Sequence, residues 1–418
     1  MDTPIVAVPM HRHLTTLIGT GLASAAAGYA CFAIFALVRG AARASAAALR
    51  IRTDAGCRRP VSILKPLCGD EPGLYGNLRS FCTQSYPVFQ VLFGVRDPRD
   101  AAVPVVRRLQ AEFPEVDIQL VIDPRVHGTN LKVSNLLNIL PEARYDWLVL
   151  ADSDIGVSSD YLGLVTRHLS DPDVGVVTCL YRSVPRSGLW SRLGAMFIDD
   201  WFAPSVRVSH ALGSTRFAFG ATIALRRQTL QAAGGFEALS DLLADDFWLG
   251  EFTRRMGMRT VLSNVVVTTD VTEGSLSALW EHELRWLRTI RSSEPVGFAF
   301  SFVTFTIPML AVGLMLARTE VCATIAAIGA VARIVLHYLQ RQRRIGRPVM
   351  LLAVRETLLL AEWAAAHVGS RVRWRDQVLD ASVGRTATAA VLHASAGTSP
   401  SRSLATLNPA MPLARLPR

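Results

Sequence analysis

Residues 14–38 form one uncharged run, LTTLIGTGLASAAAGYACFAIFALV, and no other feature restricts the fold of this chain as strongly. As a helix, these 25 residues can cross a bilayer core about 30 Å thick, and a backbone in lipid must satisfy its own hydrogen bonds. Arg39 and Arg43 follow the run, whereas a cleaved signal peptide carries its positive charge before it. We therefore expect a transmembrane anchor with residues 1–13 outside and the following domain in the cytosol.

The composition agrees with attachment to a membrane. Half of the 418 residues are hydrophobic and only 19% are charged, which is too apolar for an ordinary soluble enzyme. The net charge is +10, and the arginines gather beside the apolar runs, which favours anionic lipid over nucleic acid as the partner. The six cysteines include no C-x-x-C pair, which argues against a zinc site or a disulfide framework.

Three further apolar runs follow late in the chain, at residues 298–317, 321–339 and 349–369. The first two are about long enough to span a bilayer, and the arginine-rich segment 340–347 is expected in the cytosol. The third run contains three charged residues that would be costly against lipid, Arg355, Glu356 and Glu362. For this run we favour a helix at the interface or a re-entrant segment, and a span with a polar inner face is the alternative.

Residues 60–290 alternate strand-like and helix-like patterns. The strand-like runs are 61–67, 89–95, 117–122 and 146–152, and the helical ones are 71–85, 103–112 and 130–140. This alternation predicts an α/β domain with a mostly parallel, Rossmann-like sheet, which binds ligands at the carboxyl ends of its strands. Beyond the membrane segments 298–369, residues 370–418 are expected to form a basic segment and a disordered tail.

Two carboxylates end the fourth strand-like run, in the sequence LVLADSDIGV. If the strand geometry continues, Asp152 and Asp154 point to the same side. Two such charges repel each other unless a cation lies between them, and Mn²⁺ or Mg²⁺ typically uses one or two carboxylates together with phosphate oxygens. The pair therefore indicates a metal and diphosphate site, and a solvated turn is the alternative.

Other polar residues occupy comparable positions. Asp97 ends the second strand-like run. Lys132 and Asn135 lie near the start of a predicted helix, where a phosphate or sugar can be held, although a capped surface helix fits equally well. Asp245 and Asp246 open another predicted helix. A helix start explains one of them as a cap or dipole partner, and the pair can supply a general base.

The segment HELRWLRTIR places three residues on part of one helical surface, Arg285, Trp286 and Arg288. Arginine is well suited to binding phosphate, and the tryptophan offers an aromatic platform beside the cations. A basic helix that lies at the bilayer surface just before residue 298 is an equally good interpretation.

Four motifs occur in a fixed order: Asp97, Asp152-Ser153-Asp154, Asp245-Asp246, and His-x-x-Arg-Trp at 282–286. Their order resembles the membrane glycosyltransferases of the processive and ceramide types, which carry three spaced Asp motifs, then Gln/Arg-x-x-Arg-Trp and membrane helices. The segments VSILKPLCGDEPGLYGNLRSFCTQSYP, HGTNLKVSNLLN and GATIALRRQTL look closest to the ceramide glucosyltransferase family. Within it, the bacterial hopanoid-biosynthesis glycosyltransferases look nearest, over about residues 15–375.

The resemblance implies a GT-A fold, a UDP-sugar donor, a divalent metal (Mn²⁺ or Mg²⁺) and an inverting transfer to a lipid hydroxyl. By the same resemblance, Asp152 and Asp154 hold the metal and the diphosphate, and Asp97 contacts the uridine part of the donor. Lys132 and Asp245 are added as candidate substrate-binding residues.

The resemblance also assigns Asp246 the role of general base. Arg285 and Trp286 would hold the diphosphate and the acceptor. His282 stands where the family usually has Gln or Arg, and a neutral histidine is a weaker partner for phosphate. It is kept as a candidate substrate-binding residue whose role is open.

We expect a multi-pass protein of the bacterial inner membrane with a cytosolic catalytic domain. It would move N-acetylglucosamine or glucose from a UDP-sugar to a membrane lipid, either a hopanoid or a ceramide-like acceptor. The alternatives are a ceramide glucosyltransferase, a processive polysaccharide synthase, which usually needs more membrane helices, and a non-enzymatic membrane scaffold. Nothing in the sequence favours nucleic-acid binding, and the oligomeric state stays open.

Overall fold

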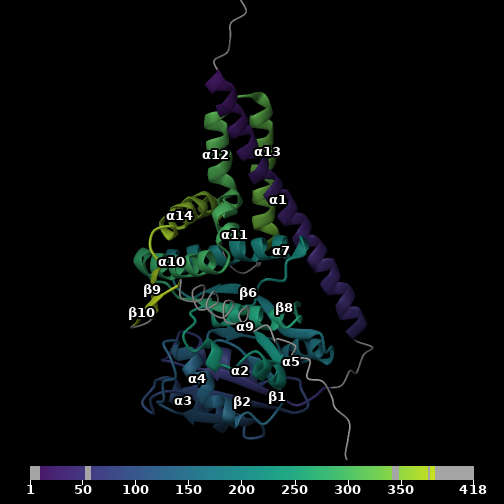
Figure 1. The fold of residues 1–418 in the computed structure, drawn as a ribbon, viewed down its shortest axis with the longest axis vertical. Helices are drawn as coiled ribbons and strands as arrows, with labels where there is room; N and C mark the ends of the chain where they lie inside the picture. The colour runs from purple at the N-terminus through teal and green to yellow at the C-terminus, as the bar shows by residue number, and fades with distance from the viewer. Residues whose placement is uncertain (1–9, 52–57, 341–347, 375–376, 382–418) are drawn as a thin grey trace, which may run out of the picture.

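The structure is a computed structural model that describes residues 10–51, 58–340, 348–374 and 377–381. Figure 1 shows a domain built on a β-sheet, a group of upright helices at the opposite end, and a belt of helices between them. Most of the N-terminal segment 1–13, the arginine-rich segment 340–347 and the predicted C-terminal tail lie outside the described residues.

An eight-stranded sheet with the order β3-β2-β1-β4-β7-β6-β8-β5 forms the centre of the domain. Its strands are β1 (Val61–Pro66), β2 (Phe89–Val95), β3 (Asp117–Ile122), β4 (Trp147–Leu150), β5 (Ile155–Gly156), β6 (Val174–Pro185), β7 (Ile223–Arg226) and β8 (Arg259–Val271). Strands β1 to β4 are mutually parallel, and β6 is parallel to β8, whereas β7 and β5 run antiparallel to their neighbours. The four strands predicted from the sequence are confirmed, with small differences at their ends.

Helices cover both faces of the sheet. On one face lie α2 (Leu74–Cys82), α3 (Ala102–Glu112) and α5 (Tyr161–Thr166), which share a buried apolar cluster with β1 and β2. On the other lie α4 (Leu131–Ile139), α8 (Arg227–Ala232) and α9 (Asp245–Arg255), which pack in a second cluster. The short helices η1 (Leu140–Glu142), η2 (Arg167–Ser170) and η4 (Glu237–Leu239) lie in the connections. The expected fold class is confirmed: an α/β domain with a mostly parallel sheet, flanked by apolar helices.

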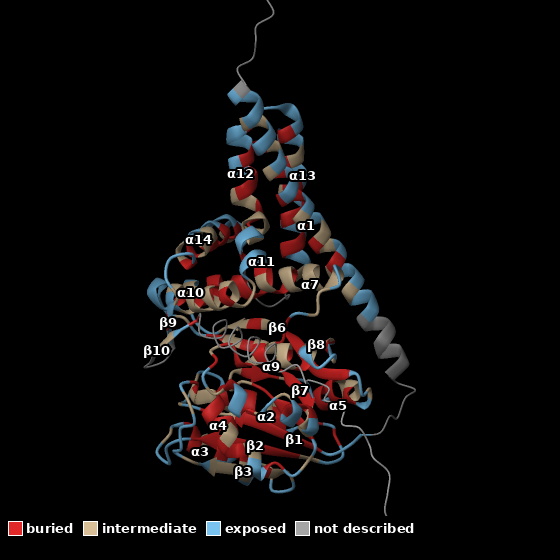
Figure 2. Cartoon of the chain, viewed as in Figure 1, coloured by how far each residue is buried: buried red, intermediate tan, exposed pale blue. Residues whose placement is uncertain are grey.

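Among the described residues, two helices are long and apolar enough to cross a membrane, α1 (Met10–Ile51) and α13 (Glu320–Gln340). Helix α1 is longer than the predicted anchor 14–38 because it continues through the arginines that follow the apolar run. Its backbone meets that of α12 (Thr306–Leu316) closely: a Cβ atom on Gly19 would lie 2.7 Å from the Gly313 carbonyl oxygen. Figure 2 shows much of the outer surface of these helices exposed, and the exposed side chains include Leu17, Ile328 and Val331. Exposed apolar side chains of this kind suit contact with lipid.

The predicted span 298–317 is not one straight helix. It is divided into α11 (Pro295–Phe300), the short helix η5 (Ser301–Thr304) and α12, with a bend of 70°. The pair makes a third candidate span only if the bent segments are counted together. Pro308 accounts for the break, because a proline cannot donate to the preceding turn and its ring clashes with the carbonyl four residues before it. A tertiary contact supports it, since the Glu356 carboxylate accepts a hydrogen bond of 2.6 Å from the Ile307 amide at the start of α12.

The belt between the sheet and the upright helices consists of α6 (Leu189–Met196), the π-helical turn η3 (Phe197–Phe202), α7 (Ala203–Ala211), α10 (Leu276–Ser293) and α14 (Met350–Ala366). Figure 1 shows α14 lying across the direction of α12 and α13, beside α10. The charges of α14 are buried in ion pairs instead of facing lipid. Arg355 lies 2.7 Å from Glu283 and 2.5 Å from Glu362, and Glu356 pairs with Arg333. A small hairpin, β9 (Arg371–Trp374) and β10 (Gln377–Asp380), follows α14.

Candidate active site

The chain between β4 and β5 carries the first two acidic residues. Strand β4 ends at Leu150, so the regular alternation expected through Asp152 and Asp154 does not continue, and a turn takes its place. Two contacts hold this turn: the Lys65 ammonium donates to the Asp152 carbonyl at 2.6 Å, and the Asp152 amide donates to the Gly220 carbonyl at 3.3 Å. The turn is therefore fixed by its neighbours in the sheet and not by strand geometry.

Asp154 lies beside Asp152 and is half-buried. Its carboxylate accepts a hydrogen bond from the Thr269 hydroxyl, and its carbonyl accepts one of 3.1 Å from the Asn77 amide side chain. Burial raises the pKa of Asp154 to about 7, and the negative charge of Asp152 acts in the same direction. Two carboxylates that hinder each other's ionisation make a site that a cation stabilises.

Lys132 joins two of the predicted motifs. Its Nζ atom, at the start of α4, lies 2.8 Å from Oδ1 of Asp152 and 3.1 Å from Oδ2 of Asp245. Burial by itself lowers the pKa of Lys132, but the charges of Asp152, Asp245 and Asp246 raise it above its ordinary value. The lysine is thus held as a cation between the turn after β4 and the start of α9.

Asp246 lies at the first turn of α9 with both carboxylate oxygens engaged. Its Oδ2 accepts from the Gly220 amide at 2.8 Å and its Oδ1 from the Phe247 amide at 2.7 Å. Burial raises the pKa of Asp246 to about 6, and the charge of Asp245 adds to the effect. This carboxylate is consequently a stronger base than an ordinary aspartate and is still ionised at neutral pH.

Gly220 is where the two acidic motifs meet. A Cβ atom on this residue would lie 2.6 Å from Oδ2 of Asp152 and 3.0 Å from Nζ of Lys132. Its amide binds Asp246 and its carbonyl binds Asp152. A Cβ atom here would push the Asp152 carboxylate and the Lys132 ammonium away, so glycine lets both lie against this backbone. Sequence reasoning gave this residue no role, and a glycine directly before the strand-like run ATIALR was the signal available.

Lys65 was also missed. It is buried in β1, its Nζ lies 3.9 Å from the centre of the Phe81 ring, and burial lowers its pKa to about 7. A lysine inside an otherwise apolar strand was one signal. The printed sequence supplies a second, because Lys65 and Lys132 are its only two lysines. Both lie beside Asp152.

Helix α10 carries the third predicted group. Trp286 packs edge-on against Tyr181 and Phe197, with ring centres 6.3 and 5.6 Å apart. The pKa of Tyr181 is raised by burial and by the charge of Asp246, and the positive charge of Arg285 opposes this. His282 instead pairs with Glu273 through Nδ1. Arg288 donates to carbonyls of the segment after α14, 2.8 Å from that of Val368, which is a structural role.

Two predicted residues stand apart from the cluster. The Asp97 carboxylate lies in an exposed turn after β2 and accepts from the Arg99 amide at 2.8 Å. That backbone hydrogen bond lowers the pKa of Asp97. Asn135 is buried, and its amide donates to the Gly94 carbonyl at 2.8 Å, so it ties α4 to the end of β2 and does not face a ligand.

A divalent cation at this site would need ligands from the substrate as well as from the protein. Within the described residues, no group of three or more His, Cys, Asp or Glu side chains is placed to hold a metal. Asp152 and Asp154 supply the one or two carboxylates that Mg²⁺ or Mn²⁺ takes when substrate phosphates provide the other ligands. The raised pKa of Asp154 agrees with this set of donors, because a bound cation offsets the repulsion between the two carboxylates.

Comparison with known proteins yields one family. The model of "Glycosyl transferase family 21" matches residues 28–387. A ceramide glucosyltransferase of Caenorhabditis elegans is 26% identical over 229 residues, which cover 54% of this chain and 49% of the relative. The ceramide glucosyltransferase of Candida albicans is 35% identical over 114 residues, covering 24% of this chain and 21% of the relative. The chain thus spans at most about half the length of these relatives.

Solved structures show a more distant similarity. The mannosyltransferase PcManGT from Pyrobaculum calidifontis, solved with GDP-Man and Mn²⁺, is 20% identical, and the match covers 83% of this chain and 99% of that one with a TM-score of 0.46.

Proposed function

Because this chain belongs to glycosyl transferase family 21, we propose that it transfers one sugar from a UDP-sugar to a hydroxyl group of a membrane lipid. The observation that carries the proposal is the meeting of Asp152, Lys132 and Asp246 around Gly220. Apolar helices on the same chain suit an acceptor that stays in the bilayer. Such an acceptor need not be extracted into water, which would cost about 0.8 kcal/mol per CH₂ group.

Asp246 is proposed as the general base. An alcohol has a high pKa, so its oxygen attacks efficiently only if a positioned group removes the proton. In the proposed reaction, the acceptor oxygen bonds to the anomeric carbon of the sugar, and its proton passes to the Asp246 carboxylate. The bond between that carbon and the phosphate oxygen breaks, UDP leaves with the electron pair, and attack from the opposite side inverts the anomeric centre.

Positive groups of the chain are proposed to hold the leaving diphosphate. Lys132 lies beside Asp152, and Arg285 lies near Tyr181, within the influence of the same acidic cluster. Asp152 and Asp154 would hold Mn²⁺ or Mg²⁺, which when bound supplies charge neutralisation for the diphosphate. Asp97 and Asp245 are proposed as donor-binding residues, Trp286 as a wall of the acceptor site, and His282, through its pair with Glu273, as a support for that wall.

The proposed lipid is a hopanoid-type acceptor that receives N-acetylglucosamine. Transfer of glucose to a ceramide-type lipid is the second candidate, and the two ceramide glucosyltransferase relatives support it. A processive synthase is less well supported, because the described residues contain two candidate spans, or three if the bent pair is counted. We place the protein in the bacterial inner membrane, with the catalytic domain in the cytosol.

The test is a donor and acceptor matrix with membranes that contain the full chain. Labelled UDP-glucose and UDP-N-acetylglucosamine are each supplied with a hopanoid alcohol or a ceramide, with Mn²⁺ or with a chelator, and the products are identified by mass spectrometry. A lipid bearing one sugar, formed only with metal and absent with Asp246→Asn, is the expected result. A long sugar polymer, or an equal yield from the Asp246→Asn chain, would overturn the proposal.

A further inference from the structure

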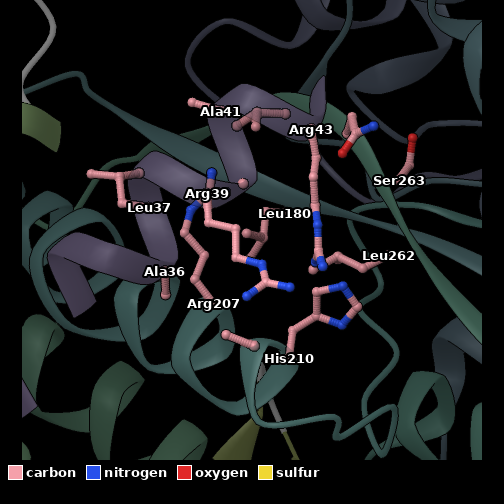
Figure 3. A pocket seen from close by; sticks show the side chains of 14 residues that line it. Ala36, Leu37, Arg39, Ala41, Arg43, Leu180, Arg207, His210, Leu262 and Ser263 are labelled. Carbon is pink, nitrogen blue, oxygen red and sulfur yellow. The ribbon is translucent and has the colours of Figure 1, made fainter. Parts of the chain in front are cut away.

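A second polar site lies where α1 leaves its apolar stretch, away from the acidic cluster. It is an open pocket of about 220 Å³ between α1, α7 and the strands β6 and β8. Four basic residues line it, Arg39, Arg43, Arg207 and His210. Figure 3 shows the side chains of Arg39 and Arg43 converging from α1 towards the His210 ring on α7, with Arg207 beside them. Among the residues described there, none that lines the pocket is acidic.

The positive charges of this pocket lack counter-charges. Within the described part of the chain, none of the three arginines forms an ion pair with a carboxylate. Nε of Arg207 and Nδ1 of His210 are buried without a hydrogen-bond partner. Burial lowers the pKa of the Arg207 guanidinium, and the positive charge of Arg182 adds to the effect. A cluster that concentrates like charges in this way is stabilised by a bound anion.

The position of the pocket indicates which anion. Arg39 directly follows the uncharged run 14–38, so the pocket lies level with the end of the membrane-crossing part of α1. Arginines at that level meet the phosphates of the cytoplasmic leaflet. Leu37, Leu180 and Leu262 add an apolar wall beside the charges, as a lipid with a phosphate head and a glyceride body requires.

We propose that this pocket binds the phosphate of an anionic membrane lipid. Arg39, Arg43 and Arg207 hold the phosphate oxygens, and the site is distinct from the one that takes the acceptor. Leu180 lines the pocket while Tyr181, the next residue on β6, packs against Trp286, and side chains of successive strand residues point to opposite faces. A ligand here therefore lies behind β6 and contacts α1 and α7 together.

The test uses the full purified chain in a maltoside detergent, titrated with dioleoylphosphatidylglycerol while native mass spectrometry counts bound lipids. Arg39→Gln and Arg207→Gln each remove one charged partner of the phosphate and are expected to weaken binding about tenfold or more. Arg192→Gln is the matched control, because Arg192 is an exposed arginine on α6, a helix of the same belt. The affinity of the Arg192→Gln chain for this lipid should stay within about twofold of that of the unchanged chain.

Competition experiments then show whether the bound phosphate belongs to a lipid or is free in solution. Dioleoylphosphatidylcholine and inorganic phosphate are titrated as competitors. Displacement by inorganic phosphate at equal concentration identifies a free phosphate as a sufficient ligand, and failure to displace assigns the site to the anionic lipid. The thermal midpoint of each variant is measured, and because Arg39 is exposed, Arg39→Gln carries the test even if Arg207→Gln fails to fold. Unchanged binding by Arg39→Gln, or equal weakening by Arg192→Gln, would overturn the proposal.

Discussion

The ammonium nitrogen of Lys132 lies 2.8 Å from Oδ1 of Asp152. These residues come from the start of α4 and the turn after β4, and the same ammonium reaches Asp245 at the start of α9. One cation therefore fixes three elements at the point where the candidate diphosphate site is assembled. Its removal leaves the buried Asp245 and the half-buried Asp152 without this counter-charge.

We expect Lys132→Gln to lower kcat/KM by about a hundredfold or more, because it removes a partly buried charge that we propose holds the diphosphate. Steady-state kinetics with the donor varied will measure this, and circular dichroism will check the fold. Arg227→Gln is the control, since Arg227 is a half-buried cation on α8 away from the acidic cluster. Equal activity of the Lys132 and Arg227 variants would show that Lys132 has no special role.

The raised pKa of Asp246 predicts how kcat/KM falls at low pH, the acid limb of the pH profile. Its carboxylate accepts a proton only when ionised, and its pKa is raised to about 6, so kcat/KM should fall tenfold per pH unit below about 6. An ordinary aspartate would hold its activity to about pH 4. A metal ion held by Asp152 and Asp154, as proposed, would lower the pKa of Asp154, so the profile is measured at saturating metal to assign the fall in activity to Asp246.

Asp246→Asn should reduce kcat by about 10²- to 10⁴-fold and remove this limb from the residual activity. The measurement is the pH dependence of the residual rate of Asp246→Asn, compared with that of the unchanged chain. A limb that persists in the Asn variant would assign the titration to another group.

Substitution of Gly220 tests how closely the acidic motifs pack around it. In Gly220→Ala, the new methyl group would lie 2.6 Å from Asp152 and 3.0 Å from Lys132, so these groups must move and activity should drop at least tenfold. Gly163→Ala is the matched control, because Gly163 lies in α5 with no atom within 4 Å of the new methyl group. That variant should keep full activity and gain up to about 1 kcal/mol in stability.

Gly19 and Gly21, both on α1, form a second matched pair, because only Gly19 faces α12. Gly19→Ala would place a methyl group 2.7 Å from the Gly313 carbonyl oxygen, whereas Gly21→Ala meets nothing within 4 Å. Separation of α1 from α12 should cost about 1–3 kcal/mol in Gly19→Ala. Thermal unfolding in detergent will measure the two midpoints. A midpoint for Gly19→Ala as high as that of Gly21→Ala would contradict the close contact.

Much of the sheet domain was predictable because its strands are apolar runs separated by turns. The predicted strand 89–95 and β2 (Phe89–Val95) have the same limits. The break at Phe305 was missed because the prediction rested on hydrophobicity, although Pro308 inside the run is a sequence signal for a broken helix. The supporting contact could not be read from the run itself, because Glu356 lies 49 residues from the amide of Ile307 that it binds.

The candidate site was predictable where chemistry is concentrated in a short motif. Asp152 and Asp246 could be chosen because each belongs to an acidic pair next to a strand or helix end. Gly220 could not, because a glycine's role here comes from the space that its neighbours in the fold require. The isolation of Asp97 and the structural use of Asn135 likewise depend on side-chain directions that a sequence pattern does not contain.

The pairing of Glu283 with Arg355 has a practical consequence for anyone who wishes to crystallise or assay the catalytic part alone. Helix α10 carries Arg285 and Trp286, and its Leu287 side chain is buried in one apolar cluster with Leu359 and Phe298. A fragment truncated after residue 290 would leave Glu283 with no counter-ion and would present a greasy surface to water. A water-soluble version must therefore keep α14, or redesign the side of α10 that α14 protects.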